Sequence, residues 1–141
     1  MGRKNNFVID DGFQTFTFSN ANGEVISSFR INPTDVNLMG RCEEVSAFLT
    51  EQQQKIEEGN NSISDIVSIN AMLEEKVDYM FGYNASNTLF RPPLTATTVL
   101  PDGELFLSLV LDRVYEVIKP EVEKRRAAAV KAAEKYTAKY K

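Results

Sequence analysis

The chain has 141 residues, of which 43% are hydrophobic and 26% are charged, and its formal net charge at neutral pH is −4. This length suits one domain, and this composition excludes an intrinsically disordered chain. No apolar run approaches the roughly 18 to 20 residues that a membrane-spanning helix requires, so we expect no membrane segment. Residues 1–6 are basic but precede no apolar stretch, so we expect no signal peptide.

Two residue types that carry much enzyme chemistry are nearly absent. The chain has no histidine and a single cysteine, Cys42, so neither a Ser-His-Asp triad, a Cys-His pair, an ordinary zinc site nor an internal disulfide can form. No glycine-rich nucleotide-binding motif is present. Many acids fall in adjacent pairs such as Glu43-Glu44, which is typical of solvated helix faces. We therefore predict a non-enzymatic intracellular protein with no cofactor, no metal and no catalytic residues.

The first quarter of the chain has the pattern of β-strands. Phe16 and Phe18 alternate with threonines, which is the period of two that buries one face of a strand. Asn22-Gly23 suits a tight reversal. An isolated hairpin is marginally stable, so we expect its aromatic face to pack on helices. The predicted hairpin pairs 13–18 with 25–31, and residues 7–9 offer a third strand.

Three apolar stripes with helical spacing follow the β segment. Asn32-Pro33-Thr34-Asp35 offers an N-cap, a proline at the first helical position and an acid in the first turn, and Gly59 suits the end of that helix. Ser62 with Asp65 resembles a capping box, and Gly82 suits the end of the second helix. The predicted helices are 33–58, 62–81 and 103–119, the last continuing past Pro120. Residues 83–101 are predicted to form an extended loop that crosses the surface.

The chain changes character at Pro120, which we predict kinks or interrupts the third helix. Beyond it the sequence is rich in alanine and charge, with strong helix propensity but few large apolar side chains. Residues 119–141 hold eight Lys or Arg and three Glu, a net charge of +5, whereas residues 1–118 carry −9. The predicted division is a globular α+β domain, 1–119, and a basic Ala-rich helical extension, 120–141.

A basic helical extension on an acidic body has three interpretations. It is a solvated helix without a partner, a helix that docks on an acidic protein or on another copy of the chain, or a nucleic-acid-binding segment. The acidic whole argues against nucleic acid. The candidate contact residues are Lys124, Arg125, Arg126, Lys131 and Lys135.

Together these patterns predict an α+β, mainly α fold, in which an N-terminal β-hairpin packs on a three-helix core with a C-terminal helical extension. The predicted core consists of apolar positions on the strands and helical stripes. Its members are Phe16, Phe18, Phe29, Val45, Leu49, Ile66, Ile69, Leu73, Val77, Leu105, Leu109 and Val114.

The most specific motif lies between Val77 and Phe90. Asp78 is followed after two residues by Phe81-Gly82, then by a small polar turn and the pair Leu89-Phe90. This arrangement resembles a segment of the tail assembly chaperones of long-tailed phages and prophages of Gram-positive bacteria. The resemblance spans about residues 24–118. The chain departs from the commoner family pattern after Phe-Gly, where an acid and a second glycine often stand.

The resemblance implies a non-enzymatic chaperone in the bacterial host cytoplasm that binds the tape measure protein and assists assembly of the tail tube protein, with homo-oligomerisation open. Partner contacts would then include Phe81, Gly82, Leu89 and Phe90. A purely structural interpretation is also open, because Phe81-Gly82 suits any helix end and Leu89-Phe90 suits loop packing. The alternatives are a structural virion component (a connector or tail-completion subunit) and a small nucleic-acid-binding regulator.

Overall fold

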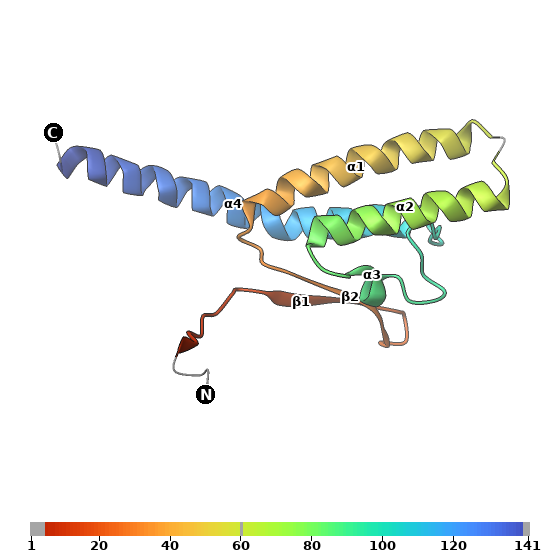
Figure 1. Ribbon diagram of the computed structural model, residues 1–141, viewed down its shortest axis with the longest axis horizontal. Helices are drawn as coiled ribbons and strands as arrows, with labels where there is room; N and C mark the ends of the chain where they lie inside the picture. The colour runs from red at the N-terminus through yellow and green to blue at the C-terminus, as the bar shows by residue number, and fades with distance from the viewer. Residues whose placement is uncertain (1–4, 60, 140–141) are drawn as a thin grey trace.

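The computed structural model describes residues 5–59 and 61–139. The elements in chain order are β1 (Gln14–Ser19), β2 (Val25–Ile31), α1 (Val36–Glu57), α2 (Ile63–Phe81), α3 (Ser86–Leu89) and α4 (Phe106–Lys139). The predicted α+β, mainly α class is confirmed, since an antiparallel hairpin precedes the helices (Figure 1). Residues 1–4, within the predicted basic start, and 140–141, the end of the predicted extension, lie outside the described residues.

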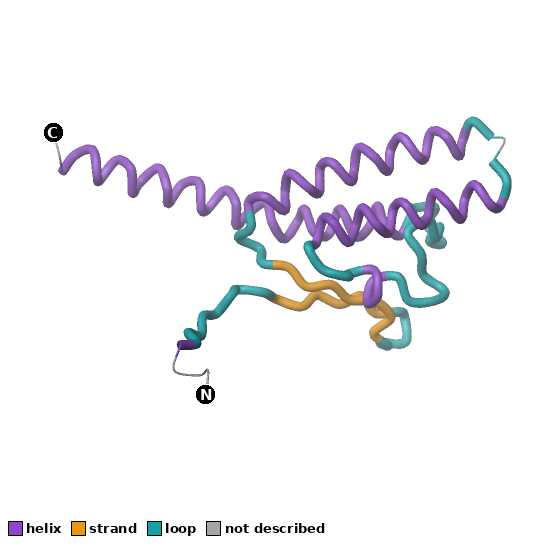
Figure 2. Tube along the Cα trace, in the orientation of Figure 1, coloured by secondary structure: helices purple, strands orange, loops and turns teal. Residues whose placement is uncertain are grey.

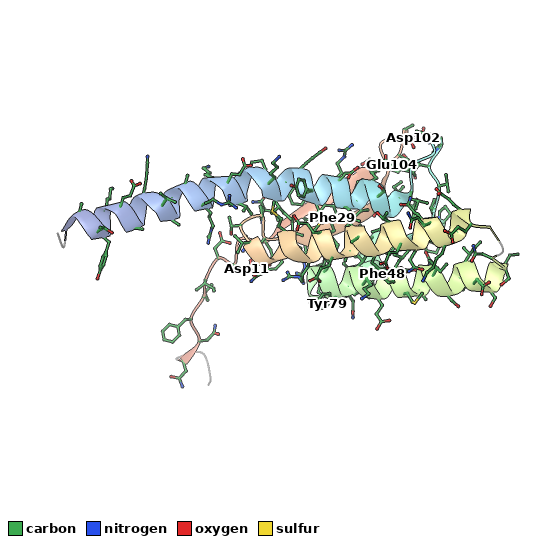
Figure 3. The ribbon with its side chains drawn as sticks, turned by 90° about the horizontal axis from the view of Figure 1, so that it is seen from above. Asp11, Phe29, Phe48, Tyr79, Asp102 and Glu104 are labelled. Atoms are coloured by element: carbon green, nitrogen blue, oxygen red, sulfur yellow. The ribbon has the colours of Figure 1, made fainter. Side chains whose placement is uncertain are left out.

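The three long helices form one layer, and the hairpin with α3 lies on one side of it (Figure 2). Seen from above, α1 runs between α2 and α4 (Figure 3), and it packs against both. α3 packs on β2 and on α2, so it joins the hairpin to the helix layer. The distal half of α4 extends beyond the rest of the molecule (Figure 1).

The hairpin has the predicted strands and contacts the helices through its aromatic face. Phe16 pairs with Phe29 across the two strands, and their ring centroids lie 5.4 Å apart. The ring centroid of Phe29 lies 5.6 Å from that of Phe81 in α2. The ring of Phe18 packs edge-on against that of Phe106 in α4, with centroids 5.5 Å apart. Aromatic pairs at these separations stabilise a fold beyond their buried area. The rings therefore anchor the two strands to α2 and α4.

The predicted third strand is wrong. Phe7, Val8 and Ile9 have no strand partner and are 88%, 90% and 81% exposed. The Asn32 side-chain amide donates to the backbone carbonyl of Asp11 at 2.9 Å, which ties the entry of β1 to the exit of β2. Residues 7–9 lie beyond that tie and extend away from the sheet (Figure 1).

One helix start is confirmed and another is corrected. Ser62 accepts a hydrogen bond from the Asp65 amide at 3.2 Å while the Asp65 carboxylate accepts from Ser62, so the capping box of α2 is complete. The first helix begins at Val36 rather than near Pro33, because Asp35 is its N-cap and accepts from the Asn37 amide at 3.0 Å. A carboxylate accepts from the free N–H groups of a first turn equally well from the cap position.

Seven predicted core residues are buried and five are only partly buried. The buried ones are Phe29, Val45, Leu49, Ile69, Leu73, Val77 and Val114. Those only partly buried are Phe16, Phe18, Ile66, Leu105 and Leu109. Near the start of α4 the buried stripe runs through Phe106, Val110 and Val114, so Val114 was predicted correctly, whereas Leu105 and Leu109 lie on the neighbouring face. The first half of α4 is apolar on more than one face, and periodicity alone cannot orient such a segment.

The predicted surface loop 83–101 is also corrected. It contains the one-turn helix α3, and several of its apolar side chains enter the core. Ala85, Leu89, Phe90, Leu94 and Ala96 are buried. The first half of the segment is hydrogen-bonded to β2, and its second half is hydrogen-bonded to Asn70 of α2 and to the start of α4.

Helix α4 continues past Pro120, as predicted, and is unbroken from Phe106 to Lys139. Pro120 has no N–H to donate to the carbonyl of Glu116, so one backbone hydrogen bond is lost. Glu116 is exposed, so water can bind this carbonyl instead. Strong helix formers on both sides sustain the helix. Val122 is still buried, whereas every side chain from 123 to 138 is exposed. We call residues 123–138 the arm.

Candidate protein-binding site

The motif of residues 77–90 forms a compact corner at the end of α2. Gly82 takes a left-handed conformation, with φ of 81°, that ends the helix, a backbone state for which glycine is best suited. The Asp78 carboxylate accepts hydrogen bonds from the Ser86 amide at 2.7 Å and from the Ser86 hydroxyl at 2.8 Å. These two bonds cap α3 and fix the turn between the helices.

The second half of the motif ties this corner to the hairpin. The buried Ser27 hydroxyl donates to the carbonyl of Leu89 at 2.7 Å, and the Thr88 hydroxyl donates to the carbonyl of Ser28 at 2.9 Å. The Tyr83 hydroxyl accepts from the Arg30 amide at 2.8 Å. These three hydrogen bonds therefore join β2 to the motif corner.

The structure brings Phe81, Leu89 and Phe90 together but buries all three side chains. Phe81 contacts the rings of Phe29 and Tyr83, and Phe90 contacts the ring of Phe106. Gly82 is exposed. These positions give the corner its shape, and their burial leaves little apolar side chain for another protein to contact.

Replacing Asp78 with alanine is expected to lower the free energy of unfolding by roughly 1.5–3 kcal/mol, because two bonds to a charged acceptor are lost. Ser86→Ala is the matched control, since it removes only the hydroxyl bond and should cost about 0.5–1.5 kcal/mol. Urea unfolding midpoints of the two variants give the comparison. Equal, negligible losses would show that Asp78 does not hold the corner.

The five basic candidates lie on α4, away from the motif corner. Lys124, Arg125, Arg126, Lys131 and Lys135 are all exposed and belong to the arm. Arg125 and Arg126 also line a hollow between α4 and the start of α1, with Val36, Met39 and Val122. The structure therefore separates the two groups of predicted contact residues, one in the core and one on a projecting helix (Figure 1).

An apolar groove that the sequence did not predict lies between α1 and α2. It is a hollow of about 570 Å³ between side chains of the two helices. Its lining residues are Glu44, Phe48, Met72, Glu75, Lys76 and Tyr79. Met72 is 43% exposed and Tyr79 is 62% exposed, so both leave apolar surface open on this face of the helix pair. Figure 3 labels Phe48 and Tyr79 on this α1–α2 side, with α4 beyond α1.

The charges around the groove are mainly acidic. Glu44 on α1 and Glu75 on α2 are exposed, and Lys76 is the one basic lining residue, with its ammonium 5.0 Å from the centre of the Phe48 ring. The seven-residue spacing of Met72 and Tyr79, off the buried stripe of α2, is the signal that could have identified this surface. An apolar floor with acidic edges suits an amphipathic segment that carries positive charge.

Three titratable groups of the described residues have pKa values shifted from their ordinary values. Burial, reinforced by Glu43 and Asp112, raises the pKa of the Cys42 thiol to about 11, so it stays protonated and unreactive. Burial also raises the pKa of Glu74, which Asn70 partly opposes by a hydrogen bond. Partial desolvation and the neighbouring carboxylate of Asp102 raise the pKa of Glu104 (Figure 3). Among the described residues, no three His, Cys, Asp or Glu side chains are grouped as metal ligands.

In the described part of the chain, no helix has both the length and the apolar composition needed to cross a bilayer. Comparison with protein-family models, curated proteins and solved structures finds no match for this chain.

Proposed function

We propose that this protein is a non-enzymatic phage tail assembly chaperone that acts in the cytoplasm of the bacterial host. It binds the tape measure protein and assists assembly of the tail tube protein. The observation that carries the proposal is the resemblance of residues 77–90 to the corresponding segment of that family. The organisation around it, a short hairpin followed by long helices, agrees with the resemblance.

The groove between α1 and α2 provides a physical basis for this role. A tape measure protein is a long, largely helical chain whose apolar faces are exposed until the tail tube surrounds it. A helix of such a chain can lie along two neighbouring helices and bury its apolar face against Phe48, Met72 and Tyr79. The acidic body, meanwhile, keeps the complex soluble.

The test is co-expression with the tape measure protein of the phage or prophage that encodes the chain. We expect the chain to keep the tape measure protein soluble and to be captured with it. The double variant Met72→Ala, Tyr79→Ala should weaken capture by about 10- to 100-fold, because central aromatic contacts dominate such interfaces. Val67→Ala is the control, since Val67 is 62% exposed on α2 but lines no part of the groove.

Unchanged capture by the groove variant would place the client elsewhere on the protein. Absence of any capture or solubilising effect would overturn the chaperone role. Presence of the chain in purified virus particles would instead favour a structural component of the tail.

A further inference from the structure

The arm is a helix that the rest of the chain leaves uncovered. All its described side chains are exposed, and α4 is continuous through Pro120, so the arm is carried rigidly away from the body (Figure 1). A helix with so few large apolar side chains gains little stability from packing. Its strongest feature is charge.

The charges of the arm match those on one face of α1, the helix that forms one side of the groove. Lys124 and Lys131 lie seven residues apart on one face of the arm, and Lys135 lies close to the same face. Glu44 and Glu51 lie seven residues apart on one face of α1, and both are exposed. In each helix this spacing amounts to about 10.5 Å along the axis. Two lysines of the arm can therefore meet two glutamates of α1 at once.

The arm cannot reach the groove of its own chain. α4 lies on the opposite side of α1 from α2 (Figure 3), and the arm extends beyond the body in the direction of α4 (Figure 1). A return to the groove would require a sharp bend, and the helix is unbroken to Lys139. An arm in the groove must come from a second copy.

We propose that the α1–α2 groove of one copy binds the arm of a second copy, antiparallel to α1. Lys131 then lies opposite Glu44 and Lys124 opposite Glu51. Ala127 and Ala128 face Phe48 in this register, and their small side chains leave room for its ring and for the lysine stems. The parallel register is disfavoured, because it sets Lys135 against Lys55 of α1.

This contact joins two different surfaces, so each copy offers one arm and one groove. Such head-to-tail contacts produce open chains or rings rather than a closed dimer. The association depends on several exposed ion pairs, each weak alone, so it should weaken as salt rises. The contact shares the groove with the proposed function but does not depend on its client. The test therefore uses the purified chain alone.

The experiment is sedimentation velocity at rising protein concentration, at about 50 mM and about 500 mM salt. We expect the mean sedimentation coefficient of the natural chain to rise without a plateau at the dimer in low salt, and to fall to the monomer value in high salt. Glu44→Lys with Glu51→Lys should abolish the rise, as should Lys124→Glu with Lys131→Glu. The chain that combines all four substitutions should associate again, because the charges are exchanged across the contact.

The control is Glu24→Lys with Glu57→Lys, which has the same net charge as the groove variant but changes exposed positions outside the groove. It should associate like the natural chain. All substituted residues are exposed, and circular dichroism verifies that each variant is folded. A monomer at every concentration in low salt, a dimer that saturates, or a four-fold variant that stays monomeric would each overturn the proposal.

Discussion

Replacing Leu73 with alanine is expected to lower the free energy of unfolding by about 2–5 kcal/mol, the range for truncating a buried leucine. Leu73 is fully buried in α2, on the stripe that includes Ile69 and Val77. The truncation leaves a cavity that the neighbouring helices can only partly fill. Urea unfolding followed by circular dichroism gives the measurement.

Met72→Ala is the matched control, because Met72 is the preceding residue of the same helix but is largely exposed. It should change stability by less than about 0.5 kcal/mol, as is usual for surface substitutions. Similar losses in both variants would mean that the buried face of α2 is assigned incorrectly. Leu109→Ala should lower the free energy of unfolding by less than Leu73→Ala does, because Leu109 is only partly buried.

Removal of residues 123–141 is expected to abolish self-association while the body stays folded. The truncated chain keeps Val122, the last buried residue of α4. Its thermal midpoint should change by less than about 4 °C, which corresponds to a loss below roughly 1 kcal/mol. Sedimentation at low salt should give the monomer at every concentration.

A second truncation that removes residues 120–141 tests where the body ends. It also loses Val122, and burial of a valine side chain contributes about 1.5–3 kcal/mol. This shorter chain should therefore unfold at a clearly lower temperature than the chain that ends at Val122. If the chain that ends at Val122 were already unfolded, the arm would be part of the folding unit and our division of α4 would be wrong.

Local signals in the sequence predicted most of the secondary structure. The capping box at Ser62 and Asp65, the left-handed glycine at Gly82 and the alternating aromatics of the hairpin each depend on contacts between residues near in sequence. Such contacts are encoded in short windows, so their interpretation needs no knowledge of the rest of the fold. The α2 stripe through Leu73 and Val77 was assigned correctly for the same reason.

Long-range packing decided the rest. Phe7, Val8 and Ile9 have the composition of a strand, but a strand forms only where a neighbouring edge is within reach, and the tie between Asn32 and Asp11 lies between them and β1. In α4 the buried face depends on how α1 approaches it. Helix α4 continues past Pro120, because the hydrogen bond that the proline removes lies at an exposed turn where water can replace it.

The candidate site also combines features that local sequence predicts with features that long-range packing decides. The sequence by itself determined the basic character of the arm and the Asp78 to Phe90 motif, because charge and local spacing can be read directly from the chain. Only the tertiary structure decided that Phe81, Leu89 and Phe90 are buried while Met72 and Tyr79 stay exposed beside Phe48. Exposure of an apolar side chain depends on which helices lie next to it, and that is a property of the assembled fold.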